Sequence, residues 1–370
     1  MSAWKSLNRP STWLGLISVL LLCGIAIENL TFTDTLTGMT YHRSQTIWIV
    51  LGLIAAGVVA SMDVAFVRKL SPTLYQVVVV LLAAVLVVGR EINYSRRWIE
   101  LGPVNIQPSE FMKLSIILML ADYFDRKRAN SAWLARHLLA PFALMMLPVV
   151  LINLEPDLGT SLCVALVAAS IILYDGIHGR TLMAGLVVVM LAVPIAWEFG
   201  VIRNYQKGRV EAWLSLDEEA VADKRSAQSS QAEQALWAVG SGKVSGRTDG
   251  DARSSVLRHL PFLHTDFALA AYAERFGLLG CFFLFGLYAA IVAWALHLAD
   301  HAQERFDALV AVGVAALIFW QFFINAGMVI GLLPVVGLTL PLVSYGGSSS
   351  LTVLLGVGFL MNIATRRKSR

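Results

Sequence analysis

The side chains best placed for chemistry are three carboxylates at the edges of apolar segments. Asp266 closes a long polar stretch, residues 201–266, and an apolar run follows it. Glu155 and Asp157 come directly after another apolar run and flank a proline. A positioned carboxylate can accept a proton as a general base, and paired carboxylates can bind a divalent cation such as Mg²⁺ or Mn²⁺. Asp157 and Asp266 could instead act only as N-caps of the helices that follow them.

Glu110 and Lys113 lie inside an apolar segment that begins near a Gln-Pro pair. Proline at the first helical position followed by an acidic residue is typical of a helix start, so Glu110 could be a favourable first-turn charge. Residues three apart share a helix face, and ionisable groups inside a membrane span usually pair or face a polar cavity. We therefore expect an inward-facing ion pair, which either supports a cavity or touches substrate.

Two further segments could bind an anion. Residues 89–102 mix arginines with aromatic side chains, among them Arg97 and Trp98, which suits either an interface anchor or a grip on an anionic head group. The last apolar loop, residues 331–350, is broken by glycines and prolines, and such backbone at membrane depth needs protein or water around it. Its Gly-Gly-Ser turn, which ends at Ser348, could present backbone N–H groups to an anion at a helix N-terminus.

Composition predicts the elements that must position these residues. The chain has 370 residues, of which 57% are hydrophobic and only 15% are charged, against about 25% charged in soluble domains. This excludes an ordinary soluble protein and indicates one all-α polytopic membrane domain over residues 1–370. Apolar runs predict ten spans, some of them short or tilted. They fall near residues 13–27, 46–62, 73–89, 107–121, 138–153, 159–174, 181–199, 275–298, 309–330 and 345–363.

The distribution of Lys and Arg predicts the orientation, because short loops rich in these residues stay in the cytoplasm. Fourteen of them fall on the side of the two termini, against four in short loops on the other side. Both termini are therefore expected in the cytoplasm, and residues 201–266 outside the cell membrane. The fourteen are Lys5, Arg9, Arg68, Lys69, Arg126, Lys127, Arg128, Arg136, Arg180, Arg305, Arg366, Arg367, Lys368 and Arg370, and the four are Arg43, Arg90, Arg96 and Arg97.

The same features exclude several classes of protein. The net charge of +4 is explained by cytoplasmic loops beside anionic lipid head groups and implies no nucleic-acid partner. Cys23, Cys163 and Cys281 lie inside apolar runs, so no disulfide framework is expected. The first apolar run lacks a small-residue cleavage motif, and we expect it to be a retained helix rather than a signal peptide.

The 201–266 stretch contains nine Lys and Arg, and a loop of this length is usually either functional or disordered. Apolar side chains spaced along it favour an ordered loop that docks on the helices and carries chemistry. These side chains are Tyr205, Trp213, Leu216, Leu236, Trp237 and Val239.

Four separated motifs make the chain similar to the SEDS family (shape, elongation, division and sporulation). They are Arg-Trp-Ile-Glu-Leu-Gly (97–102) with Gln-Pro-Ser-Glu (107–110) and Lys113; Pro-Asp-Leu-Gly-Thr (156–160); His-Thr-Asp-Phe (264–267) with Glu274 and Gly277; and Leu-Pro-Val-Val-Gly (333–337) with Tyr-Gly-Gly-Ser (345–348). Gln234 and the Gly-Ser-Gly at 240–242 also fit the family pattern. The resemblance implies a ten-helix peptidoglycan glycosyltransferase of the bacterial cytoplasmic (inner) membrane, which polymerises lipid II on the outer face.

A transferase of this kind needs a base for the sugar 4-hydroxyl and positive charge for the departing pyrophosphate. Asp266 is the expected base because it precedes a span at the outer interface. Substrate-binding or supporting roles are expected for Glu110, Lys113, Glu155, Asp157, Arg97, Trp98, His264, Gln234 and Ser348. A divalent cation, Mg²⁺ or Mn²⁺, near Asp157 would assist the leaving group.

The resemblance also implies partners. They are the nascent polyprenyl-pyrophosphate-linked glycan, a class B penicillin-binding transpeptidase and other proteins of the elongation complex. The short N-terminal tail and the Leu-Pro-Val-Val-Gly stretch favour the elongation branch, which maintains rod shape, over the division branch. Residues 243–250, Asn105 and the Phe262-Leu263 pair depart from the family pattern, which bears on how the long loop grips substrate.

Three alternatives stay open. The first is a transporter that flips lipid II without chemistry, the second a structural partner of the transpeptidase, and the third a division-type polymerase. Many transporters show inverted repeats and broken helices at mid-membrane. This sequence shows no internal repeat, and its acidic candidates cluster at the outer ends of spans.

The predicted orientation can be tested by cysteine labelling in intact cells. With the native cysteines replaced, an impermeant thiol reagent should modify a cysteine introduced at Ser229 and leave one at Ser369 unmodified until the cells are opened, because short basic segments remain inside. Labelling of the Ser369 position alone would reverse the orientation.

Overall fold

The described part of the chain is almost entirely helical. The computed structural model describes residues 10–92, 95–101, 104–127, 133–198, 204–214, 227–247, 257 and 260–366. Strands β1 (Arg90–Ile92), β2 (Ser95–Leu101) and β3 (Val104–Ile106) form a small antiparallel sheet. The helices are α2 (Pro10–Thr37), α3 (Tyr41–Ser61), α4 (Val64–Val88), α5 (Pro108–Arg126), α6 (Ala135–Leu154), α7 (Leu158–Asp175), α8 (Gly179–Glu198), α9 (Asn204–Leu214), α10 (Ala227–Ser241), α11 (Ala268–Asp300), α12 (Arg305–Val329) and α13 (Gly347–Arg366).

Eight of the described helices are long and apolar enough to cross a membrane: α2, α3, α4, α6, α7, α11, α12 and α13. They coincide with eight of the ten predicted spans, and the other two, residues 107–121 and 181–199, are helices α5 and α8. α5 is less apolar because five charged residues lie within it. Helix α8 includes the shorter apolar stretch Gly179–Val188, and the sequence stays apolar to Trp197. The predicted all-α polytopic membrane fold is confirmed.

Several helices extend beyond the apolar runs that predicted them. The run at 13–27 is part of α2, which continues to Thr37. In this extension the fully buried Asn29 donates from Nδ2 to the carbonyl oxygen of Ala268 (3.0 Å). Polar residues that find partners inside the protein can remain helical at membrane depth, so hydropathy alone underestimates helix length here.

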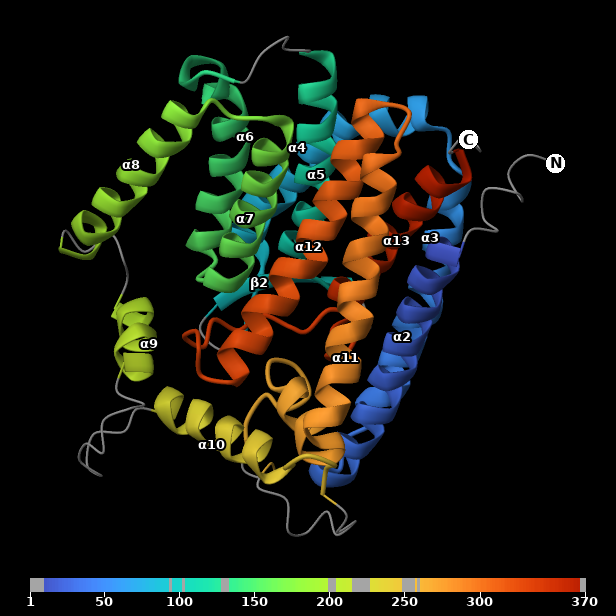
Figure 1. Ribbon diagram of the computed structural model, residues 1–370. Helices are drawn as coiled ribbons and strands as arrows, with labels where there is room; N and C mark the ends of the chain where they lie inside the picture. The colour runs from blue at the N-terminus through green and yellow to red at the C-terminus, as the bar shows by residue number, and fades with distance from the viewer. Residues whose placement is uncertain are drawn as a thin grey trace.

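The bundle has two distinct ends (Figure 1). α2 begins and α13 ends at one of them, whereas α9 and α10 lie at the other. α12 runs through the interior, where it contacts α5, α7, α11 and α13. This arrangement agrees with the prediction that the long polar stretch and the two termini lie on opposite sides.

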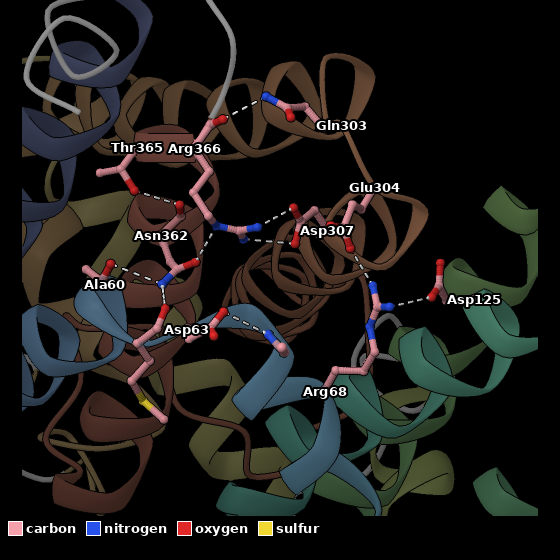
Figure 2. A network of polar contacts seen from close by, with 12 residues as sticks. Ala60, Asp63, Arg68, Asp125, Gln303, Glu304, Asp307, Asn362, Thr365 and Arg366 are labelled. Atoms are coloured by element: carbon pink, nitrogen blue, oxygen red, sulfur yellow. Dashed lines mark hydrogen bonds and ion pairs between the residues drawn. The ribbon is translucent and has the colours of Figure 1, made fainter. Parts of the chain in front are cut away.

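Ion pairs tie the helices together at the end that holds the start of α2 and the end of α13 (Figure 2). The Arg366 guanidinium makes two hydrogen bonds to Asp307, both of 3.0 Å. Arg68 on α4 pairs with Asp125 on α5 at 3.2 Å. The buried Asn362 donates from Nδ2 to three backbone carbonyls at the end of α3. These contacts link α3, α4, α5, α12 and α13.

The predicted long loop, residues 201–266, is partly helical, because α9 and α10 lie within it. Trp213 docks as predicted and donates from Nε1 to a backbone carbonyl just after α12 (2.8 Å). The prediction for Trp237 is wrong, since its side chain is 58% exposed. Leu216 and the side chain of Tyr205 lie outside the described residues.

α11 is broken at Gly277, whose φ of 62° and ψ of −163° are not helical. The turn after α10 takes the place of the missing helical bonds, since Leu278 N donates to Lys243 O (2.9 Å). The two segments approach so closely that a β-carbon on Gly246 would lie 2.0 Å from Arg275 O. Glycine is required here both for positive φ and for this close approach.

Gly277→Ala should therefore destabilise the protein. A β-carbon at this position would lie 2.3 Å from Gly246 N, and a non-glycine residue at positive φ adds strain of about 1–3 kcal/mol. We expect a clearly lower melting temperature in detergent. The matched control is Gly286→Ala in the same helix, where no atom lies within 4 Å and alanine favours helix. Equal melting of the two variants would contradict the packing argument.

Candidate active site

Asp266 lies in a tight turn that leads into α11. Phe262 O accepts hydrogen bonds from Thr265 N and Asp266 N, both of 3.1 Å. The N-cap position of α11 is Phe267, and no side chain caps the helix. The alternative that Asp266 serves only as an N-cap is therefore wrong. Its carboxylate lies close to Gly337 in the loop before α13, where an added β-carbon would come within 3.4 Å of Oδ2.

The surroundings of Asp266 adjust its proton affinity. The pKa of this carboxyl is raised to about 6, chiefly by burial and also by the nearby charge of Asp157. A hydrogen bond with Thr265 and the positive charges of Arg209 and Arg97 act in the opposite direction. The result is a carboxylate that is mostly ionised at pH 7 and more basic than an ordinary aspartate.

Asp157 caps α7 and also belongs to the group of charges around Asp266. Its Oδ1 accepts from Thr160 N (3.1 Å), and its Oδ2 accepts from Gln107 Nε2 (3.0 Å) and lies 3.8 Å from an Arg97 nitrogen. The capping interpretation is thus confirmed for Asp157. Its effect on the pKa of Asp266 shows that capping does not remove it from the site.

Glu155 is 1% exposed, and neither carboxyl oxygen has a hydrogen-bond partner among the described residues. Burial, followed by the charge of Asp157, raises the pKa of this carboxyl to about 9, although Arg97 lowers it. Glu155 therefore carries a proton at neutral pH, and Asp157 and Asp266 supply the negative charge.

Arg97 on β2 is fixed by the main chain around the carboxylates. Its Nε donates to Glu155 O (2.9 Å), and one terminal nitrogen donates to Pro156 O. The side chain stays partly exposed. Trp98 is partly buried and pairs across the sheet with Arg90. Within the described residues it makes no hydrogen bond to the charged group, so the structure brings Arg97 into the site and leaves Trp98 beside it.

The fit of a divalent cation can be judged from the donors present. No group of three or more His, Cys, Asp or Glu side chains suited to a metal is found among the described residues. Both oxygens of Asp157 are already engaged by Thr160 and Gln107. Because these donors do not make a ready cation site, no step is assigned to a metal ion.

The predicted ion pair is present: Lys113 Nζ lies 2.7 Å from Glu110 Oε2. Lys113 has no exposed surface and also donates to Gln321 Oε1 on α12 (3.4 Å). Gln321 in turn donates to Thr339 and to Ser349 Oγ (3.1 Å). The pair supports the loop before α13, which in turn borders Asp266.

The remaining predicted residues lie around the edge of the site. His264 stacks on Tyr41, with ring centroids 4.0 Å apart, and burial lowers the pKa of its imidazole. Ser348 Oγ accepts from Gln107 N (3.2 Å). Gln234 lies on α10 and is partly buried.

The amide groups of the Gly-Gly-Ser turn, predicted to meet an anion, are in part already engaged. Gly346 N donates to Gln45 Oε1 (3.1 Å) on α3. Gly347 packs against the Trp48 ring, which an added β-carbon would approach to 2.2 Å. The first part of this turn thus faces α3 rather than a ligand.

Sequence reasoning missed two buried amides on α12. Gln321 and Asn325 are four residues apart, and neither has exposed surface. Asn325 donates from Nδ2 to Asp266 O (2.9 Å) and to Leu338 O (2.7 Å). Polar residues at helical spacing inside an apolar run were the available signal. Arg209 was also missed, because a charged residue in a polar stretch gives no sign of its partner.

A family model described as cell cycle protein, for FtsW, RodA and SpoVE, matches residues 11–369. The chain belongs to the FtsW/RodA/SpoVE family. The peptidoglycan glycosyltransferase MrdB of Escherichia coli K12 is 34% identical over 320 residues, or 86% of this chain and 84% of the relative. A probable peptidoglycan glycosyltransferase FtsW of Hydrogenovibrio crunogenus is 34% identical over 366 residues, covering 95% of this chain and 90% of the relative.

Solved structures agree with this assignment. The rod shape determining protein RodA of Thermus thermophilus superposes with a TM-score of 0.70 at 27% identity, covering 97% of this chain and 98% of RodA. A chain from a peptidoglycan synthase complex that coordinates polymerization and crosslinking superposes with a TM-score of 0.81 at 30% identity, over 97% of this chain and 98% of that chain. This FtsW/RodA/SpoVE family member is an integral membrane peptidoglycan glycosyltransferase.

Removing either partner of the Glu110–Lys113 pair should destabilise the protein. A buried charge without its partner costs about 3–5 kcal/mol, so Glu110→Gln and Lys113→Met should each lower the melting temperature and the yield of folded protein. The double variant should lose less than the sum of the two single changes. Glu28→Gln is the control, because Glu28 pairs with Arg275 but is itself half exposed, and ion pairs in contact with solvent contribute at most about 1 kcal/mol. Additive losses at positions 110 and 113 would contradict pairing.

Proposed function

We propose that this chain polymerises lipid II on the outer side of the bacterial cytoplasmic membrane, with Asp266 as the general base. The proposal rests on the Asp266 carboxylate, which has a pKa of about 6 and two arginines near it. Asp266 directly precedes α11, which begins at the end of the bundle where α9 and α10 lie (Figure 1). A base works best when its pKa lies close to the working pH, so that it is both ionised and able to hold a proton.

The reaction follows from this arrangement. The 4-hydroxyl oxygen of the acceptor sugar attacks the anomeric carbon of the donor, and its proton passes to Asp266. The bond between that carbon and the pyrophosphate oxygen breaks, and the electron pair leaves with the pyrophosphate. Arg97 and Arg209 supply positive charge where the leaving group becomes more negative.

We assign the chain to the elongation branch, in complex with a class B penicillin-binding transpeptidase. Similarity to MrdB and to RodA supports this assignment, as does the synthase complex, which combines polymerization and crosslinking. The division branch is the alternative, because FtsW relatives reach the same 34% identity. The elongation branch predicts that this protein restores rod shape in cells depleted of their elongation polymerase. It should not rescue cells depleted of their division polymerase.

The transporter alternative predicts a different outcome. A flippase must open toward the cytoplasm, whereas ion pairs join α4, α5, α12 and α13 at the end that carries the termini (Figure 2). Purified protein given labelled lipid II should therefore form glycan strands. Movement of lipid II across vesicles without polymer would favour transport.

Asp266→Asn should abolish polymerisation while leaving the protein folded. Loss of a general base lowers the rate about a hundredfold or more, and asparagine preserves the size of the side chain. The wild-type rate should fall as the pH drops through about 6, because protonation of Asp266 removes the base. Asp300→Asn, at a carboxylate that is 81% exposed, is the control and should keep the wild-type rate. Polymerisation by Asp266→Asn within a few-fold of wild type would exclude Asp266 as the base.

A further inference from the structure

We propose that Asn325 on α12 is a positioning residue for the Asp266 carboxylate, because its one amide group holds the Asp266 turn against the loop that precedes α13. The inference rests on the proposed role of Asp266 as the base. Asn325 does not need to touch substrate for this role. It would act through the backbone of Asp266 and of Leu338.

Asn325 connects two segments of the chain through hydrogen bonds from its side-chain amide. Its Nδ2 donates to Asp266 O at 2.9 Å and to Leu338 O at 2.7 Å. The Asn325 side chain has no exposed surface. A buried amide with both N–H groups engaged fixes its two acceptors relative to each other.

The second acceptor, Leu338 O, matters because Leu338 is next in the chain to a residue that lies close to the Asp266 carboxylate. Leu338 follows Gly337, where an added β-carbon would come within 3.4 Å of Asp266 Oδ2. Gly337 has a φ of 76°, which suits glycine. By holding Leu338 O and Asp266 O together, Asn325 keeps the carboxylate next to the backbone of Gly337.

The neighbouring carbonyl groups of the Asp266 turn are also hydrogen-bonded to other segments of the chain. His264 O accepts from Tyr345 N (2.8 Å), and Thr265 O accepts from Ser344 Oγ. Three successive carbonyl groups, 264 to 266, thus each have a donor from another segment. Asn325 differs from the other two donors because it belongs to a membrane-spanning helix.

Gln321 lies one helical turn before Asn325 and holds the next residue of the loop, Thr339, in the same way. Its Nε2 donates to Thr339 O (3.1 Å), while its Oε1 accepts from Lys113 (3.4 Å). The two amides therefore hold the carbonyls of Leu338 and Thr339 in sequence. This second bond keeps the loop in place when Asn325 is changed, so an Asn325 variant should loosen the turn rather than unfold it.

A looser turn should have two measurable effects on the reaction. The first is a fall in kcat of about tenfold to a hundredfold, since small displacements of a reacting group are costly, with little change in KM. The second is a shift of the acid limb of the pH profile to lower pH. Burial is the largest cause of the raised pKa of Asp266, and water entering the turn would reduce it.

The charged groups around Asp266 would not by themselves move the acid limb of the pH profile in an Asn325 variant. Arg209 on α9, Asp157 before α7 and Arg97 on β2 all face the carboxylate, and none of them changes in an Asn325 variant. A defect limited to folding would reduce the amount of active enzyme and leave the position of the acid limb unchanged. The pH profile therefore separates positioning from a purely structural role.

The experiment compares Asn325→Leu and the milder Asn325→Ser with wild type, as purified full-length protein assayed on lipid II across the acid limb. The matched control is Asn362→Leu on α13. Asn362 is also a buried asparagine whose Nδ2 donates to backbone carbonyls, at 2.7–3.0 Å, but it lies at the other end of the bundle (Figure 2). We expect both Asn325 variants to lower kcat and to move the acid limb of the pH profile below about pH 6. Asn362→Leu should lower the melting temperature and leave the position of the acid limb unchanged.

An unchanged kcat in both Asn325 variants would overturn the proposal, and so would a lower kcat with an unmoved acid limb. Failure of both variants to fold would assign Asn325 to folding instead, and would also overturn it. These outcomes are separate from failure of the proposed base. If Asp266→Asn polymerises lipid II normally, the mechanism fails, whereas an inactive Asp266→Asn with unaltered Asn325 variants rejects the positioning role alone.

Discussion

Polar groups buried among membrane-spanning helices must find their partners inside the protein, because lipid supplies none. In this chain the constraint acts most strongly around α12. Lys113, Gln321 and Asn325 all lack exposed surface, and their partners come from α5, from the loop before α13 and from the Asp266 turn. Apolar packing discriminates weakly between protein and lipid. These polar contacts therefore position α5, the loop before α13 and the Asp266 turn around α12.

Charge in the proposed active site is close to balanced before substrate arrives. Glu155 is protonated at neutral pH, which leaves the carboxylates Asp157 and Asp266 opposite the guanidinium groups of Arg97 and Arg209. A pyrophosphate brought into this group would add negative charge, and a nearby like charge raises the pKa of a carboxyl. Asp266 would then hold a proton more strongly at the step where it receives one.

Much of this could be predicted from the sequence, for identifiable reasons. Apolar runs locate helices because lipid selects for them, and the three-residue spacing of Glu110 and Lys113 predicts their pairing directly. Asp157 as a cap follows from its place after a proline. In contrast, Asn325 and Asp266 are far apart in the chain, and nothing local to either residue indicates the other. Trp237 shows a related limit: an aromatic residue in a polar stretch indicates burial, yet its side chain is largely exposed.

The length of some helices and the break in α11 were also beyond sequence reasoning. The predicted run at 275–298 covers most of α11, whereas the helix begins at Ala268. Its first turns are held by buried polar contacts, such as that from Asn29. Gly277 belongs to a family motif in the sequence, but nothing local to it indicates that the helix breaks there against the turn after α10.

Because of the break at Gly277, part of the backbone of α11 is hydrogen-bonded to a segment about 35 residues earlier in the chain. Leu278 N and Leu279 N donate to Lys243 O and Val244 O, so two carbonyl groups of the segment after α10 take the place of helical acceptors. For protein engineering, residues 242–246 therefore count as part of the membrane domain. A fluorescent tag or an epitope placed there would unravel the helix, however polar and loop-like the sequence looks.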